Sequence, residues 1–125
     1  MFLNKPVENS DTKNPLQKAV IQLANLYNRN QFSAVIEQSY TLTNKYPEIS
    51  VVWIILGASH AKIGNLDKAI QSYQHALSLN PNYAEGYNNL GVVLKEKGNI
   101  NKAIKAKKKA LSLKPDYPEA YSNMG

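Results

Sequence analysis

Apolar residues recur at helical spacing along residues 50–83. Four positions share the i, i+3, i+4, i+7 spacing of one helix face: Trp53, Leu56, Gly57 and His60. A second stripe with helical spacing follows in the same segment: Ile70, Tyr73, Ala76 and Leu77. Because this spacing is typical of amphipathic helices, residues 50–83 are predicted to contain two helices.

Helix-breaking residues separate the two stripes and end the second one. Gly64-Asn65 lies between them, and Gly readily takes the left-handed backbone that ends a helix. Asn80-Pro81 follows the second stripe, and Pro cannot continue a helix. Each segment is therefore predicted to be a helical hairpin, with Gly57 facing Ala69 so that the helices approach closely.

The hairpin pattern repeats with a period of 34 residues. Residues 84–117 match residues 50–83 without a gap at 13 of 34 positions. Three prolines keep the same register: Pro47, Pro81 and Pro115. Residues 118–125, PEAYSNMG, begin a further copy in phase and are expected to form the first helix of a truncated repeat. Since one hairpin cannot bury both stripes alone, the copies are expected to stack.

The N-terminal third of the chain follows the pattern less closely. Residues 15–49 are predicted to be a degenerate capping hairpin that begins at Asn14-Pro15, a good helix start. Leu23 and Val35 stand where small residues are expected, which predicts wider packing. Asn30 stands at the position of Gly64 and Gly98. The polar residues 1–14 are expected to be a flexible leader.

Residues in both full segments resemble the tetratricopeptide repeat (TPR) pattern. Residues 50–83 match it at Trp53, Leu56, Gly57, Ala69, Tyr73, Ala76 and Pro81. Residues 84–117 match it at Tyr87, Leu90, Gly91, Ala103, Ala110 and Pro115, and Lys107 departs from it. The resemblance implies an all-α fold, a right-handed superhelical array of antiparallel helical hairpins. It also implies a non-catalytic scaffold that binds a protein or peptide partner.

The repeats are also similar to those that precede catalytic domains in O-linked N-acetylglucosamine transferases and bacterial fused transferases. This second likeness implies an alternative function. The chain would then be a substrate-recruiting arm of a larger enzyme, with its catalytic domain beyond residue 125.

The TPR resemblance implies a concave groove, lined by the first helix of each hairpin, that holds an extended peptide. The positions left over by the packing stripes are expected to face this groove: Gln17, Val20, Ile21, Ala24, Asn28, Val51, Ile54, Ile55, Ala58, Lys62, Glu85, Asn88, Asn89, Val92, Glu96, Glu119, Ser122 and Asn123. Three apolar ones, Val51, Ile54 and Ile55, are expected to form an apolar half-groove, unless the first hairpin, the leader or a second copy covers them.

Asn89 and Asn123 are 34 residues apart, at the position where asparagines of the glycosyltransferase repeats form a ladder along the groove. A solvated or helix-packing role for both stays open. The Lys and Asn positions that clamp a carboxylate in chaperone-binding members of the family hold Val20, Ala24 and Ile54 in this chain, so that clamp is not expected.

Positive charge is concentrated near the C-terminus. The chain carries a net charge of +6, and residues 95–125 hold 8 Lys against 3 Asp and Glu. Four lysines form a basic stripe on the second predicted helix of residues 84–117, and this stripe is expected on the convex side: Lys102, Lys105, Lys108 and Lys109. A solvated face is the favoured interpretation. No aromatic residues interleave with the stripe for base stacking, so nucleic acid and membrane are not favoured as partners.

Lys107 replaces the core aromatic Tyr73 of the preceding segment. Its stem is expected to lie along the core while its head reaches water. The last hairpin is therefore predicted to be looser than the one before it.

The sequence contains no pattern of catalytic chemistry. There is no Cys, no Ser/His/Asp set, no His-Glu metal spacing and no Gly-rich phosphate loop. No catalytic residue, metal or cofactor is therefore predicted. No signal peptide or membrane span is evident, and a cytoplasmic protein is expected. Self-association through the open end at Tyr121–Gly125 is a further hypothesis.

Overall fold

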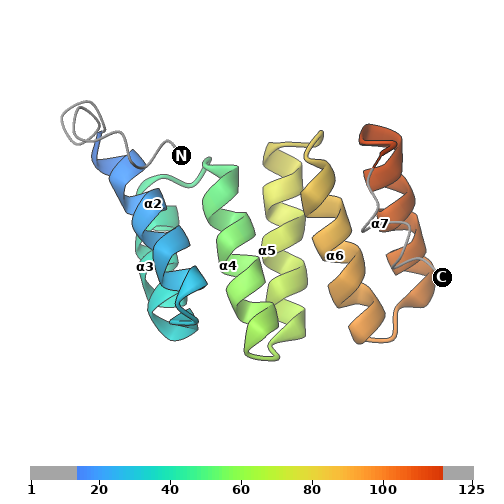
Figure 1. The fold of residues 1–125 in the computed structure, drawn as a ribbon, viewed down its shortest axis with the longest axis horizontal. Helices are drawn as coiled ribbons and strands as arrows, with labels where there is room; N and C mark the ends of the chain where they lie inside the picture. The colour runs from blue at the N-terminus through green and yellow to red at the C-terminus, as the bar shows by residue number, and fades with distance from the viewer. Residues whose placement is uncertain (1–13, 117–125) are drawn as a thin grey trace.

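The computed structural model describes residues 14–116, which form six helices and no strand (Figure 1). The helices are α2 (Pro15–Asn28), α3 (Phe32–Lys45), α4 (Ser50–Lys62), α5 (Leu66–Leu79), α6 (Ala84–Glu96) and α7 (Ile100–Leu113). They pair in chain order as antiparallel hairpins that stand side by side. The predicted all-α array of helical hairpins is confirmed.

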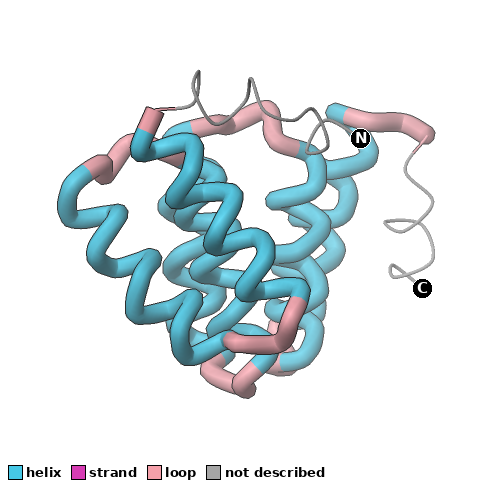
Figure 2. The backbone as a smooth tube through the Cα atoms, turned by 60° about the vertical axis from the view of Figure 1, so that its left-hand side comes forward, coloured by secondary structure: helices cyan, strands magenta, loops and turns pink. Residues whose placement is uncertain are grey.

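The hairpins stack in two layers (Figure 2). Helix α4 contacts both other first helices, α2 and α6, whereas α3, α5 and α7 make no contacts of similar extent with each other in the part of the chain that the structure describes. The array therefore curves, with the first helices on its concave side and the second helices on its convex side.

Local sequence determines where the first helix begins. The Asn14 side chain accepts a hydrogen bond from the Gln17 backbone N–H at 2.7 Å, and the Gln17 side chain accepts one from the Asn14 backbone at 3.2 Å. This capping box satisfies two backbone donors that the helix leaves unpaired. Pro15 occupies the first turn, where its missing N–H has no cost.

The turns inside the three hairpins share one backbone conformation. Gly64 and Gly98 have φ angles of 84° and 93°, and Asn30 at the equivalent position has a φ of 62°. Asn is one of the few non-Gly residues that tolerate this left-handed conformation. The first hairpin therefore keeps the same turn despite its divergent sequence.

Two main clusters form the core. The larger one joins α4 to α7 and includes Ile54, Tyr73 and Leu90. The N-terminal cluster is built on Leu23, Val35 and Val52. Helix α2 contacts α3 less extensively than α4 contacts α5, as the two bulky residues between α2 and α3 predict.

Two glycines allow close approach inside the later hairpins. A Cβ added to Gly57 would lie 2.9 Å from ring atoms of Tyr73, and one added to Gly91 would lie 2.9 Å from Cε of Lys107. Gly57 was predicted to face Ala69, but its nearest side-chain neighbour is Tyr73. The larger ring, one turn further along the same helix, reaches over the glycine.

Replacing Gly57 with Ala is expected to lower the free energy of unfolding by about 1–3 kcal/mol, because the new methyl overlaps a rigid ring in a packed core. Gly91→Ala should cost less, since the Lys107 stem is flexible and Ala favours the helix. Urea denaturation of the two variants tests this. An equal or larger loss for Gly91→Ala would contradict it.

Candidate functional site

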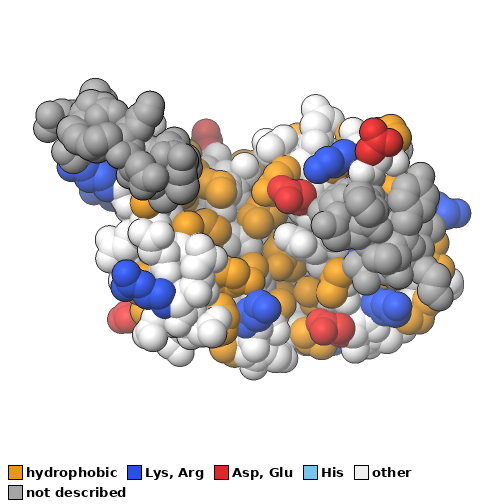
Figure 3. Space-filling view, viewed as in Figure 1, with side chains coloured by type: hydrophobic (Ala, Val, Ile, Leu, Met, Phe, Trp, Pro, Cys, Tyr) orange, Lys and Arg blue, Asp and Glu red, His pale blue; other side chains and the backbone are white. Residues whose placement is uncertain are grey.

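A groove lies on the concave side, between the first helices. It has a volume of about 290 Å³. Its lining residues come from α2, α4, α5 and α6: Tyr27, Ala58, Ala61, Lys62, Tyr73, Asn89, Val92, Val93 and Glu96. Figure 3 shows hydrophobic side chains gathered along a hollow in the middle of the molecule.

Repeat geometry places the groove residues in matching pairs. Ala58 and Val92 are 34 residues apart and give the groove an apolar lining. Lys62 and Glu96 are also equivalent, and lie one turn further along α4 and α6, so opposite charges flank one end. About one turn before Val92 on α6, the half-buried Asn89 amide has no hydrogen-bond partner among residues 14–116. The groove thus combines an apolar lining with one free amide and two charges.

Several residues predicted for the groove lie there. Ala58, Asn89 and Val92 line it, together with Lys62 and Glu96. Ile55 is half-buried against the N-terminal cluster, outside the groove lining. Val51 is 39% exposed and does not line the groove either.

The predicted groove positions of Ile54 and Asn88 are wrong. Ile54 is only 7% exposed and belongs to the larger core cluster, where Gly86 allows α6 to approach it closely. Val51, Ile54 and Ile55 therefore do not form one open half-groove. Asn88 is 6% exposed and accepts a hydrogen bond from Lys107. Asn123 lies outside the described residues.

Four lining residues are not predicted from the sequence: Tyr27, Ala61, Tyr73 and Val93. Tyr73 belongs to the packing stripe that the sequence predicts for its helix. A tyrosine is long enough to fill a seam with its ring and still border the surface beyond it. A large aromatic residue at a seam position is therefore a signal for a groove residue.

The sequence predicts that the Lys107 ammonium reaches water, and this prediction is wrong. The residue is 1% exposed, and Nζ donates a hydrogen bond of 2.8 Å to Oδ1 of Asn88. Burial lowers the pKa of Lys107 to about 8, and the positive charge of Lys95 adds to the shift. The Asn88–Lys107 pair occupies the positions that Ile54 and Tyr73 hold one repeat earlier.

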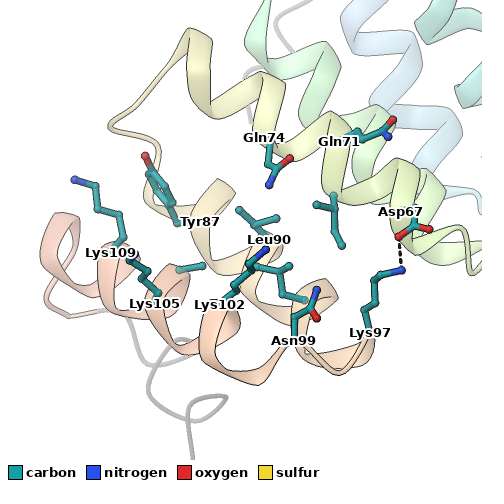
Figure 4. Close-up of a pocket in the computed structure, with 13 residues that line it drawn as sticks. Asp67, Gln71, Gln74, Tyr87, Leu90, Lys97, Asn99, Lys102, Lys105 and Lys109 are labelled. Carbon is teal, nitrogen blue, oxygen red and sulfur yellow. Dashed lines mark ion pairs between the residues drawn. The ribbon is translucent and has the colours of Figure 1, made fainter.

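The basic stripe lies on the convex side. Lys102, Lys105 and Lys109 line a larger cavity of about 740 Å³ between α5 and α7, together with residues of α6 (Figure 4). Lys108 is exposed on the same helix but does not line the cavity.

Residues 14–116 contain no group of three or more His, Asp or Glu that could hold a metal ion. None of the helices in this range has both the length and the apolar character needed to cross a bilayer.

A protein-family model described as TPR repeat matches residues 57–98 and 93–125. A search of curated proteins found no match. A crystal structure of MamA aligns with a TM-score of 0.83 at 26% identity, covering 88% of this chain and 60% of MamA. The chain thus spans about three fifths of that structure.

Two further solved structures have similar folds. The first TPR of Spaghetti (RPAP3), bound to the HSP90 peptide SRMEEVD, aligns with a TM-score of 0.82 at 18% identity, covering 86% of this chain and 88% of that one. A mutant Thermobaculum terrenum O-GlcNAc transferase aligns with a TM-score of 0.77 at 26% identity, covering 90% of this chain and 22% of the transferase.

Proposed function

Because the chain belongs to the tetratricopeptide repeat family, we propose that it is a non-catalytic scaffold that binds an extended peptide segment of a partner protein in its concave groove. The observation that carries this proposal is the Asn89 amide, which lines the groove without a hydrogen-bond partner in the described part of the chain. The peptide-bound structure of Spaghetti supports it as a similar fold with a peptide ligand.

The chemistry of the groove suits an extended backbone. An Asn side chain offers both an acceptor and two donors, so it can pair with a peptide group whatever the peptide sequence. Ala58 and Val92 are small and leave room for a peptide side chain beside the amide. Lys62 and Glu96 would orient the peptide through charges of opposite sign.

Asn89→Ala is expected to weaken peptide binding by about five- to tenfold, the effect of losing one net hydrogen bond. Peptides would first be selected from a random display library against the intact chain. Fluorescence anisotropy would then measure their affinity for the wild type and for the variant. Asn101→Ala, on the exposed surface of α7, is the matched control and should leave the affinity unchanged.

Two results would count against the concave site. One is that no selected peptide loses affinity with Asn89→Ala. The other is that Lys62→Glu and Glu96→Lys leave all affinities unchanged, because both charges line the groove.

The second proposal is a substrate-recruiting arm of a larger enzyme. The structural likeness to the O-GlcNAc transferase supports it, since this chain would correspond to about a fifth of such a protein. The gene sequence beyond residue 125 tests it: a transferase domain there would favour the arm, and its absence would favour the free scaffold. Both proposals place the chain in the cytoplasm.

A further inference from the structure

We propose that the cavity between α5 and α7 is a second docking site, which binds an acidic amphipathic helix of a partner protein. It lies on the convex side, away from the concave groove, so it goes beyond the function proposed above. We name it the convex cavity and define it by its apolar floor and its basic wall.

The floor of the convex cavity is apolar and comes from three helices. It consists of Ile70 from α5, Tyr87, Leu90 and Leu94 from α6, and Ala106 from α7. Its volume of about 740 Å³ lies within the range of ligand-binding pockets in proteins. In Figure 4, Lys102 extends from α7 toward Gln74 of α5 across this floor.

The preceding repeat shows what the same place looks like when the chain's own side chains cover it. Between α3 and α5, the Tyr40 hydroxyl lies 3.1 Å from Nε2 of His60. The Trp53 and His75 rings are 4.1 Å apart. These two pairs link the first helix of the hairpin to the second helices on both sides.

One repeat later, these four positions no longer cover the floor. The equivalents of Tyr40, Trp53, His60 and His75 are Gln74, Tyr87, Leu94 and Lys109. Gln74 is exposed and has no hydrogen-bond partner within residues 14–116, and Lys109 holds Nζ 5.9 Å from the centre of the Tyr87 ring. At the rim, Tyr40 and His75 are thus replaced by Gln74 and Lys109, whereas Tyr87 and Leu94 belong to the apolar floor.

The charge of the convex cavity favours a carboxylate-bearing partner. Lys102, Lys105 and Lys109 line one wall. Asp67 is the acidic residue among the described lining residues, and it is already paired with Lys97. Lys102, Lys105 and Lys109 have no ion-pair partner among residues 14–116, so their charges remain available to a carboxylate.

The spacing of these lysines matches a helix better than a strand. With a rise of 1.5 Å per residue, Lys102, Lys105 and Lys109 are separated by about 4.5 and 6 Å along α7. Carboxylates at i, i+3 and i+7 of a partner helix have the same separations, whereas same-face residues of a strand are evenly spaced by about 6.6 Å. The apolar stripe of such a helix would enter the floor, as helices do in apolar grooves.

The test uses a synthetic helical probe of about 15 residues, or roughly 22 Å, with a Leu stripe flanked by Glu at i, i+3 and i+7. Fluorescence anisotropy with the intact chain should show binding that weakens as salt rises. The Lys102→Glu, Lys105→Glu double variant should lose at least about tenfold in affinity. Gln74→Tyr, which copies Tyr40 of the preceding repeat, should block the floor and give a similar loss.

Matched controls separate this site from general attraction to a basic chain. Lys18→Glu with Lys108→Glu changes the net charge equally, at exposed positions outside the cavity, and should leave binding unchanged. A probe with Gln in place of Glu should bind weakly. Asn89→Ala should have no effect on the Glu probe, so failure here and failure of the concave site are distinguishable.

Four results would overturn the proposal. The first two are that the probe does not bind, or that the control pair loses as much affinity as the cavity pair. The third is binding of a synthetic peptide of residues 117–125 that Gln74→Tyr abolishes, which would make the chain's own C-terminal segment the occupant. The fourth is a dimer in sedimentation that Gln74→Tyr converts to monomer, which would make a second copy the occupant.

Discussion

Replacing Asn88 with Ile is expected to lower the free energy of unfolding by about 2–3 kcal/mol. The reason is the buried Lys107 ammonium, whose Nζ donates to Oδ1 of Asn88 at 2.8 Å in a position that is 1% exposed. Ile offers no acceptor, so the variant leaves a buried charged donor without this partner. A buried group that loses its partner costs more than the hydrogen bond itself contributes.

When Lys107→Tyr is combined with Asn88→Ile, the double variant should be more stable than the wild type, whereas Asn88→Ile alone is less stable. The double variant copies the Ile54–Tyr73 pair of the preceding repeat, where the Tyr73 ring packs against Gly57 as Lys107 packs against Gly91. Replacing a buried polar pair by apolar residues of similar volume is commonly neutral or stabilising by about 1–4 kcal/mol. We expect the double variant to be about 2 kcal/mol more stable than the wild type.

A double-mutant cycle measured by urea denaturation tests both expectations. The two positions should be strongly coupled, because the double variant is expected to be more stable than the wild type although Asn88→Ile alone is less stable. Hydrogen exchange gives a second readout, because the amides of Leu77 and Leu111 report the two later hairpins separately. Additive effects of the two single variants would contradict a buried pair, and equal protection of both leucines would contradict the predicted looseness of the last hairpin.

Much of the fold follows from local patterns in the sequence. The 34-residue spacing of the prolines and the glycines in the turns predicts the hairpins and their register. Asn14 and Pro15 predict where α2 begins, and Asn30 predicts a left-handed turn without a Gly. These signals are sufficient because each depends on the backbone preferences of one or two residues.

The sites are less predictable because they depend on which neighbour covers a given side chain. The run of apolar residues from Val51 to Leu56 has no polar face, so its periodicity cannot say that Ile54 packs toward α6 while Ile55 packs toward the N-terminal cluster. Burial of Lys107 is not predicted from the sequence, because its partner Asn88 lies at a position expected to face the groove. In this repeat, polar residues replace an apolar and an aromatic residue on both helices: Asn88 stands in place of Ile54, and Lys107 in place of Tyr73. These two replacements together are the signal that Asn88 and Lys107 form a pair.

Raising the pH from 7 to about 10.5 is expected to increase the contribution of Lys107 to the free energy of unfolding by up to about 3 kcal/mol. Burial lowers the pKa of Lys107 in the folded chain from 10.5 to about 8. Below pH 8 both states bind the proton, so the folded state carries the full cost of the buried charge. Between pH 8 and 10.5 the unfolded chain binds more protons than the folded one, and stability therefore rises with pH.

Denaturation of the wild type and of Lys107→Met across this range isolates the effect, since other titrating groups contribute equally to both. The stability difference between the two proteins should shift in favour of the wild type as the pH rises, and a constant difference would show that the ammonium is not desolvated.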